Sequence, residues 1–187
     1  MSTTITFNDL EFLAKQGECD AQYELFRFFD KEDRHNEKIG WLKKAAKNGS
    51  DKAQHQLGLS YQYGWHLKKN LDLAISWFLL AAKQQYLDSM SQLGFIYAQL
   101  GDQQRSKQWY SKVVEHHIRA VESGNVLSMH TLGLMHQNAV GLVKDNRLAF
   151  KYYLMAAIQG HIAAKTSYRN FISNLNKILT YTQITSE

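Results

Sequence analysis

Two stretches of the chain resemble each other: AQHQLGLSYQYG at residues 53–64 and SMHTLGLMHQNAVG at residues 128–141. Each has a small residue, then Leu-Gly four positions later, then a Tyr or His three positions after the glycine. Positions zero, four and eight lie on one face of an α-helix, and a glycine there lets a neighbouring helix approach closely. Both stretches therefore predict helices with a packing face.

The same spacing recurs along most of the chain. The small residue of each unit follows a junction residue by four positions, and the junction residues are Gly17, Gly49, Gln85, Gly124 and Gly160. A fixed period of this length is typical of helical-repeat arrays, in which each unit buries its apolar face against the next.

A second pattern follows in the units that begin near residues 18, 50 and 125. An aromatic residue (Trp41, Trp77 or Tyr152) precedes a pair of alanines by four positions, and the next junction follows. An aromatic side chain with two alanines one turn later allows tight helix packing, and a glycine after the helix supplies a left-handed C-terminal cap. Each unit is therefore predicted to be a helical hairpin. The units at 50 and 125 have the longer loops, 64–70 and 139–145, and the second helix of the unit at 86 is extended by about two turns.

Composition agrees with an all-helical globular chain. The 187 residues include no proline and one cysteine, Cys19, and 44% of them are hydrophobic. A lone cysteine cannot form an intramolecular disulfide, and the first residues lack the basic and apolar regions of a signal peptide, so we expect a cytoplasmic protein.

Residues 1–40 carry five basic and nine acidic side chains, whereas the whole chain has a net charge of +5. The remainder is strongly basic, which favours an acidic protein partner or nucleic acid. The alternative is a solvated surface with an excess of lysine, because the basic residues are spread out rather than clustered.

The pattern resembles the Sel-one-like repeat, a longer-looped relative of the tetratricopeptide repeat. The unit at 125 matches it at Leu132, Gly133, Gly141, Asp145, Ala149, Ala156, Ala157 and Gly160, and the unit at 50 at Ala53, Leu57, Gly58, Tyr61, Gly64, Ala74, Trp77, Ala81 and Ala82. The other two units are degenerate. The resemblance implies an all-α fold, a right-handed α-solenoid of helix-hairpin repeats. We predict a leading half-repeat helix at 1–17, repeats at 18–49, 50–85, 86–124 and 125–160, and a closing helix and tail at 161–187.

The sequence offers little sign of catalysis. It has no nucleophile elbow, phosphate-binding loop or dinucleotide fingerprint, and its eight histidines show no metal-ligand spacing, so we expect no catalytic site, cofactor or metal. His136 occupies the repeat's tyrosine position and is interpreted as a packed core residue. Cys19 precedes a helix, which could lower its pKa, but a small buried apolar residue is the simpler interpretation.

Protein binding is the function that we favour from the sequence. The first helices of such arrays line a concave wall, and positions two before, two after and six after the register leucine should face it. This stripe, with its counterpart in the first repeat, predicts partner-binding residues at Tyr23, Arg27, His55, Leu59, Tyr63, Ser91, Phe95, Gln99, His130, Leu134 and Asn138. Leu59, Phe95 and Leu134 would form an apolar row there, unless helix packing covers them.

The resemblance implies a role as an adaptor or, among small bacterial members, as an immunity protein that neutralises a toxin. We therefore predict a protein partner, possibly a toxin effector with an acidic surface, and no membrane association. A regulatory or assembly adaptor is the main alternative. A hydrolase is a weaker one, because the paired cysteines of the family members linked to beta-lactam hydrolysis are missing. Nucleic-acid binding rests only on the basic residues Lys144, Arg147, Lys151, Lys165 and Arg169.

Overall fold

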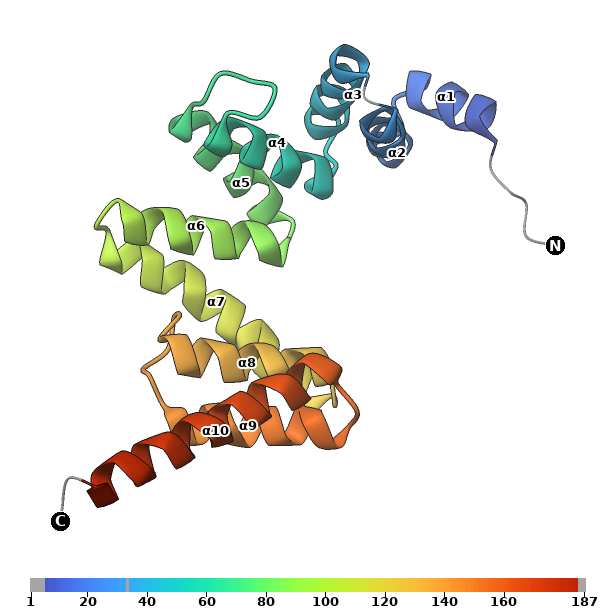
Figure 1. The fold of residues 1–187 in the computed structure, drawn as a ribbon. Helices are drawn as coiled ribbons and strands as arrows, with labels where there is room; N and C mark the ends of the chain where they lie inside the picture. Colours follow the sequence, from blue (N-terminus) through green and yellow to red (C-terminus); the bar gives the residue numbers. More distant parts are fainter. Residues whose placement is uncertain (1–5, 33, 185–187) are drawn as a thin grey trace. The chain divides into compact units, whose positions relative to one another are not determined.

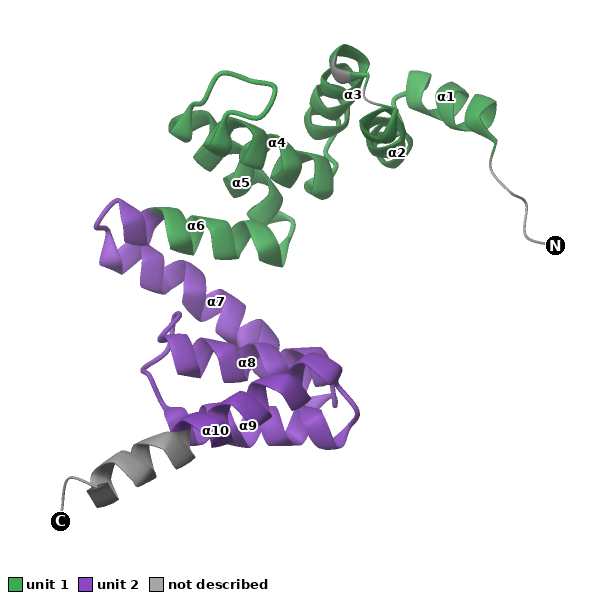
Figure 2. Cartoon of the chain, in the orientation of Figure 1, with its two compact units in different colours: residues 1–96 green, residues 97–187 purple. Residues whose placement is uncertain are grey.

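The structure is a computed structural model that describes residues 6–32 and 34–184, with only the backbone for residues 35 and 175–184. In this part of the chain there are ten α-helices and no strand (Figure 1). The chain divides into two compact units, residues 1–96 and 97–187 (Figure 2). The division falls within the helix α6 (Leu87–Gln99), which therefore contributes its last residues to the second unit.

The first unit holds α1 to α5 and most of α6. The bounds are α1 Phe7–Lys15, α2 Cys19–Lys31, α3 His35–Lys47, α4 Asp51–Tyr63, α5 Leu71–Lys83 and α6 Leu87–Gln99. Neighbouring helices pack as α1 on α2, α2 on α3, α3 on α4 and α4 on α5. Their core contains Leu42, Leu57 and the alanine pair Ala45 and Ala46, with Trp77 packed at the edge.

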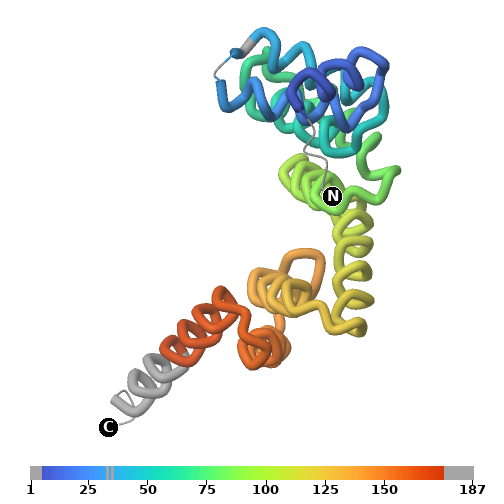
Figure 3. Tube along the Cα trace, turned by 90° about the vertical axis from the view of Figure 1, so that its right-hand side faces the viewer, coloured from blue at the N-terminus to red at the C-terminus, as the bar shows by residue number. Residues whose placement is uncertain are grey.

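The second unit holds the remaining helices, and Figures 1 and 3 show α8 and α9 side by side. The bounds are α7 Gln103–Glu122, α8 Val126–Asn138, α9 Asn146–Ile158 and α10 Ile162–Ile184. α7 has 20 residues, whereas α5 and α9 have 13 each. Met129, Ala156 and Ala164 form a buried cluster that joins α8, α9 and α10.

The glycine in two of the Leu-Gly pairs accommodates a buried ring. A Cβ added to Gly58 would lie 2.6 Å from a ring carbon of Phe78, and one added to Gly133 would lie 2.6 Å from the ring of Tyr153. Both rings belong to the second helix of the same hairpin and are fully buried. The missing side chain is therefore what lets α4 and α5, and likewise α8 and α9, approach closely.

The two long loops are closed in the same way. The backbone N–H of Asn70 donates to the Tyr61 carbonyl at 2.9 Å, and that of Asp145 donates to the His136 carbonyl at 3.1 Å. The side chains of Asn70 and Asp145 then cap α5 and α9 by accepting hydrogen bonds from backbone N–H groups of the first turn. Each loop thus returns the chain to the start of the second helix.

Candidate partner-binding surfaces

In the first unit, the predicted stripe is partly exposed. On α2, Arg27 is exposed and pairs with Glu24 at 2.9 Å, whereas Tyr23 is half-buried against the core, and burial raises the pKa of its hydroxyl. On α6, Ser91 is half-buried and donates to the Leu87 carbonyl, but Phe95 is 42% exposed. Phe95 is therefore an aromatic ring that the packing of this unit leaves accessible.

His55 lies at the contact between one hairpin and the helix that follows it, which we call a seam. Its Nδ1 is 2.9 Å from the Ser89 hydroxyl, and its ring packs 5.5 Å from that of Phe78 and 5.1 Å from that of Tyr86. Burial lowers the pKa of this imidazole, and the Asp88 carboxylate opposes that shift. The structure thus uses His55 to join α4 to the helix that follows the hairpin.

The end of α4 carries an aromatic pair, of which the sequence pattern predicts Tyr63 but not Trp65 as a partner-binding residue. The rings of Tyr63 and Trp65 stack with centroids 4.8 Å apart, and both side chains are about half exposed. Leu59, one turn before Tyr63, is half-buried. Trp65 is the second residue of the long loop, which lies outside the helical stripe, so helical periodicity could not place it beside Tyr63.

In the second unit, His130 repeats the role of His55. Its Nε2 is 3.0 Å from the Ser167 hydroxyl, and its ring packs 5.6 Å from that of Tyr153 and 4.9 Å from that of His161. Burial, followed by the charge of His161, lowers its pKa. The other stripe positions of this unit, Gln99, Leu134 and Asn138, are exposed. The predicted apolar row is thus divided between the units, with Leu59 and Phe95 in the first and Leu134 in the second, and its role stays a prediction.

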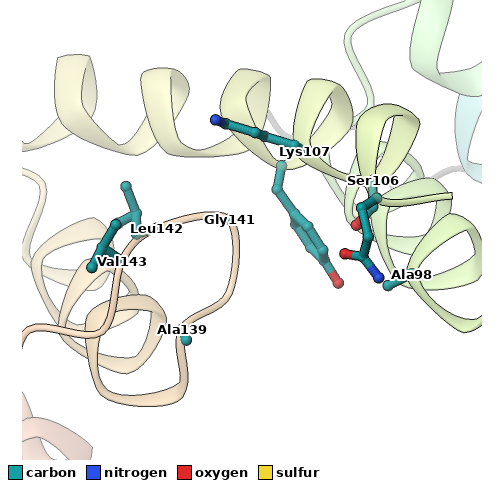
Figure 4. Close-up of a pocket in the computed structure, with 9 residues that line it drawn as sticks. Ala98, Ser106, Lys107, Ala139, Gly141, Leu142 and Val143 are labelled. Atoms are coloured by element: carbon teal, nitrogen blue, oxygen red, sulfur yellow. The ribbon is translucent and has the colours of Figure 1, made fainter. Parts of the chain in front are cut away.

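An open pocket of about 510 Å³ lies between α7 and the long loop of the last hairpin (Figure 4). Its lining residues are Ala98, Gln103, Ser106, Lys107, Tyr110, Ala139, Gly141, Leu142 and Val143. In Figure 4, Ser106 and Lys107 come from α7, and Leu142 and Val143 come from the loop. A Cβ on Gly141 would collide with Tyr110, so the loop reaches α7 only because glycine occupies this position. The pocket is of mixed polarity and could hold one side chain of a partner.

A second groove of about 310 Å³ lies between α9 and α10, with Asn146, Arg147, Phe150, Phe171 and Ile172 along its sides. Its apolar residues come from α9 and α10, which are second and closing helices. The stripe predicted on the first helices therefore does not include them. In the sequence, the adjacent Phe171 and Ile172 are the apolar signal on α10 that points to this groove.

The described residues contain no group of three or more His, Cys, Asp or Glu side chains placed to hold a metal ion. Burial and the Asp20 carboxylate raise the pKa of the Cys19 thiol. Cys19 is half-buried rather than buried at the first position of α2, and the helix start does not lower the pKa of its thiol. No helix in the described part of the chain is long and apolar enough to cross a bilayer.

Comparison with known proteins identifies the repeat. The family model of the Sel1 repeat matches residues 39–50, 51–86 and 126–161. Among solved structures, the chain is similar to a Sel1 repeat protein from Oxalobacter formigenes, with a TM-score of 0.60, 25% identity, and coverage of 87% of this chain and 74% of that one. It is also similar to a protective antigen of uropathogenic Escherichia coli strains that displays an SLR fold, with a TM-score of 0.62, 25% identity, and coverage of 86% of this chain and 35% of that one. This chain thus spans about a third of the antigen's length. A search of curated proteins finds no match.

These findings confirm the prediction of an all-α helical-repeat solenoid. Sel1 repeat proteins generally mediate protein–protein interactions and are typically not enzymes. The repeating Leu-Gly face, the hairpins closed around Gly58 and Gly133, and the three matched segments show that this chain contains Sel1 repeats.

Proposed function

We propose that the chain is a non-catalytic protein-binding module and, more specifically, a bacterial cytoplasmic immunity protein that binds and neutralises a toxin effector. We also propose the repeat boundaries given above, of which residues 1–5 and 185–187 lie outside the described residues. The observation that carries the proposal is the exposure of Phe95 on the first helix of its hairpin. A large ring that contributes little to its own fold can fill a pocket on a partner.

Other exposed side chains of the predicted stripe are also suited to contact a partner. Tyr63, with Trp65 stacked on it, and Leu134 are exposed on first helices. By contrast, His55 and His130 are half-buried and contact serine hydroxyls of other helices. We therefore propose that the rings and Leu134 contact the partner directly. The two histidines act by fixing the helix that carries them.

The test uses the product of the neighbouring gene as candidate toxin, co-expressed with this chain. Phe95→Ala should weaken binding by about 2 kcal/mol, or roughly thirtyfold in Kd, and cells should lose protection. Phe12→Ala is the matched control, because Phe12 is 63% exposed on α1 and lies outside the predicted stripe. If Phe95→Ala unfolds the protein without a separate binding defect, Phe95 is a core residue and the proposed surface is wrong.

The same assay separates the immunity role from the alternatives. An adaptor would bind its partner and leave the partner's activity intact. Nucleic-acid binding predicts tight association with duplex or single-stranded DNA that persists at physiological salt. We expect weak association that disappears there, because exposed lysines and arginines without base contacts bind mainly through counterion release.

A further inference from the structure

The groove between α9 and α10 has an apolar floor. The ring of Phe150 lies 5.2 Å from that of Tyr168 and 5.7 Å from that of Phe171, and Ile172 continues the wall along α10. All four side chains are half-buried, and the groove of about 310 Å³ is open to solvent. A volume of this size suits one aromatic or long aliphatic side chain.

The charged Lys and Arg side chains of residues 146–174, the segment that forms the groove, are not balanced by acidic ones. Residues 146–174 contain no Asp or Glu, and their four cations, Arg147, Lys151, Lys165 and Arg169, are all exposed. Arg147 lines the groove. Each helix carries its two cations four positions apart, and such positions share one helix face. The nearest carboxylate along the chain, Asp145, accepts hydrogen bonds from the N–H groups of Arg147 and Leu148 at the start of α9, and these bonds lower its pKa.

We infer that this groove docks an acidic segment of a protein partner, in which one aromatic or long aliphatic side chain enters the groove and flanking Asp or Glu side chains meet the four cations. The inference rests on the proposed function as a protein-binding module and names a second contact surface for it, away from the first-helix stripe. The apolar side chain supplies most of the affinity, since exposed ion pairs contribute little singly. The cations mainly accelerate association and select an acidic partner.

The ring contacts favour a peptide over a nucleic acid. Single-stranded nucleic acids bind through bases that stack on accessible aromatic faces beside cations. Here Phe150 packs against Tyr168 and Phe171 at interplanar angles of 35° and 46°, so its ring is already engaged within the fold. The accessible feature is the apolar groove between the helices, which suits a side chain better than a base.

The experiment selects short random peptides displayed on phage against the full chain. Enriched sequences are then synthesised with a fluorescent label and titrated by anisotropy. We expect them to combine acidic residues with an aromatic or long aliphatic one. Ile172→Gln, which keeps the side-chain size but makes the wall polar, should weaken binding at least tenfold, mainly by faster dissociation.

Charge reversal tests the other half of the inference. Lys165→Glu with Arg169→Glu should slow association at least tenfold and remove most of its salt dependence. The control is Lys43→Glu with Lys83→Glu, an equal charge change at exposed positions of α3 and α5, and it should change the affinity less than twofold. Circular dichroism checks that every variant keeps its helices.

Several outcomes would overturn the inference. The selection could enrich no peptide, or only peptides without acidic residues. The groove variants could bind the peptides as tightly as the control variant does. At physiological salt, a single-stranded oligonucleotide or anionic phosphatidylserine vesicles could bind more tightly than any peptide. Phe95→Ala separates this inference from the proposed function. Peptides that depend on Phe95 but not on the groove would refute the groove and support the first-helix surface. If the peptides depend on the groove and the cognate partner binds Phe95→Ala as tightly as the parent chain, the groove is supported and the first-helix surface is refuted.

Discussion

Replacing Gly58 by alanine tests how closely the helices of a hairpin approach one another. The added Cβ would lie 2.6, 2.8 and 3.0 Å from three ring atoms of Phe78. Phe78 is fully buried, so its ring can move only by displacing its neighbours. Overpacking of this kind costs about 1–3 kcal/mol. The better helix propensity of alanine would offset about 1 kcal/mol of this loss of stability.

Gly40 provides the matched control. It lies within α3, and a Cβ added there would have no atom within 4 Å. Gly40→Ala therefore gains the propensity without the clash and should stabilise the protein by about 0.5–1 kcal/mol. The two variants make the same chemical change, so the difference of about 1–3 kcal/mol between them reports the clash with Phe78.

The measurement is urea unfolding of both variants and the parent chain, followed by circular dichroism. A second variant, Gly58→Ala with Phe78→Leu, removes the ring that causes the clash. In the Phe78→Leu background, Gly58→Ala should destabilise the protein much less than it does in the parent chain, because the effects of residues in contact are not additive. If Gly58→Ala stabilises the protein as much as Gly40→Ala does, the close approach of α4 and α5 is refuted.

Three further predictions concern stability. Leu93→Ala, at a fully buried position of α6, should cost about 2–5 kcal/mol in urea unfolding, and a cost near zero would contradict its place in the core. Gln85→Gly should stabilise by about 1 kcal/mol, because Gln85 has a φ of 66° that glycine adopts without strain; a loss of stability would show that its side chain contributes more than that strain. Burial lowers the pKa of His55 and His130, so the unfolded chain takes up protons first as the pH falls. Stability should be complete above the unfolded pKa of about 6.5 and fall below it, and His55→Gln with His130→Gln should flatten that dependence in thermal melts at a series of pH values.

The hairpins could be predicted from sequence because their packing rule is local. Gly58 and Gly133 stand in the same place relative to Phe78 and Tyr153, and this spacing is visible in the sequence. Helix periodicity then assigns the opposing faces. His136, interpreted as a packed residue, stacks on Tyr152 with ring centroids 5.8 Å apart.

The seams between hairpins could not be predicted in the same way. Helical periodicity predicts an exposed stripe that includes His55 and His130, but both side chains are half-buried. They lie within hydrogen-bonding distance of the hydroxyls of Ser89 and Ser167 respectively. These serines follow the histidines by 34 and 37 residues, so the two pairs do not share one spacing. Whether a side chain two positions from the register leucine meets solvent or a seam depends on how the following helix crosses it. Periodicity along one helix does not determine that crossing.

The buried amides of the first unit show the same limit. Gln54 donates to the Ala46 carbonyl at 3.1 Å and accepts from Gln84 at 2.9 Å, and Gln22 forms the equivalent pair with Asn48. A glutamine on a helix usually suggests a solvated face, yet Gln22 and Gln54 are buried because each satisfies a carbonyl at the end of the preceding helix.

The basic C-terminal part illustrates what the structure adds to a charge count. In the sequence, Arg147, Lys151, Lys165 and Arg169 are compatible with either nucleic acid or an acidic protein, because charge alone attracts both. The distinction depends on what lies between the charges, and that requires the packing of α10 on α9. Because that packing engages the ring of Phe150 and leaves an apolar groove beside it, the surface that attracts an acidic partner also offers a place to bury one apolar side chain. A partner that is only acidic should therefore bind weakly and lose affinity with salt, whereas one that also carries the apolar residue should retain most of its affinity.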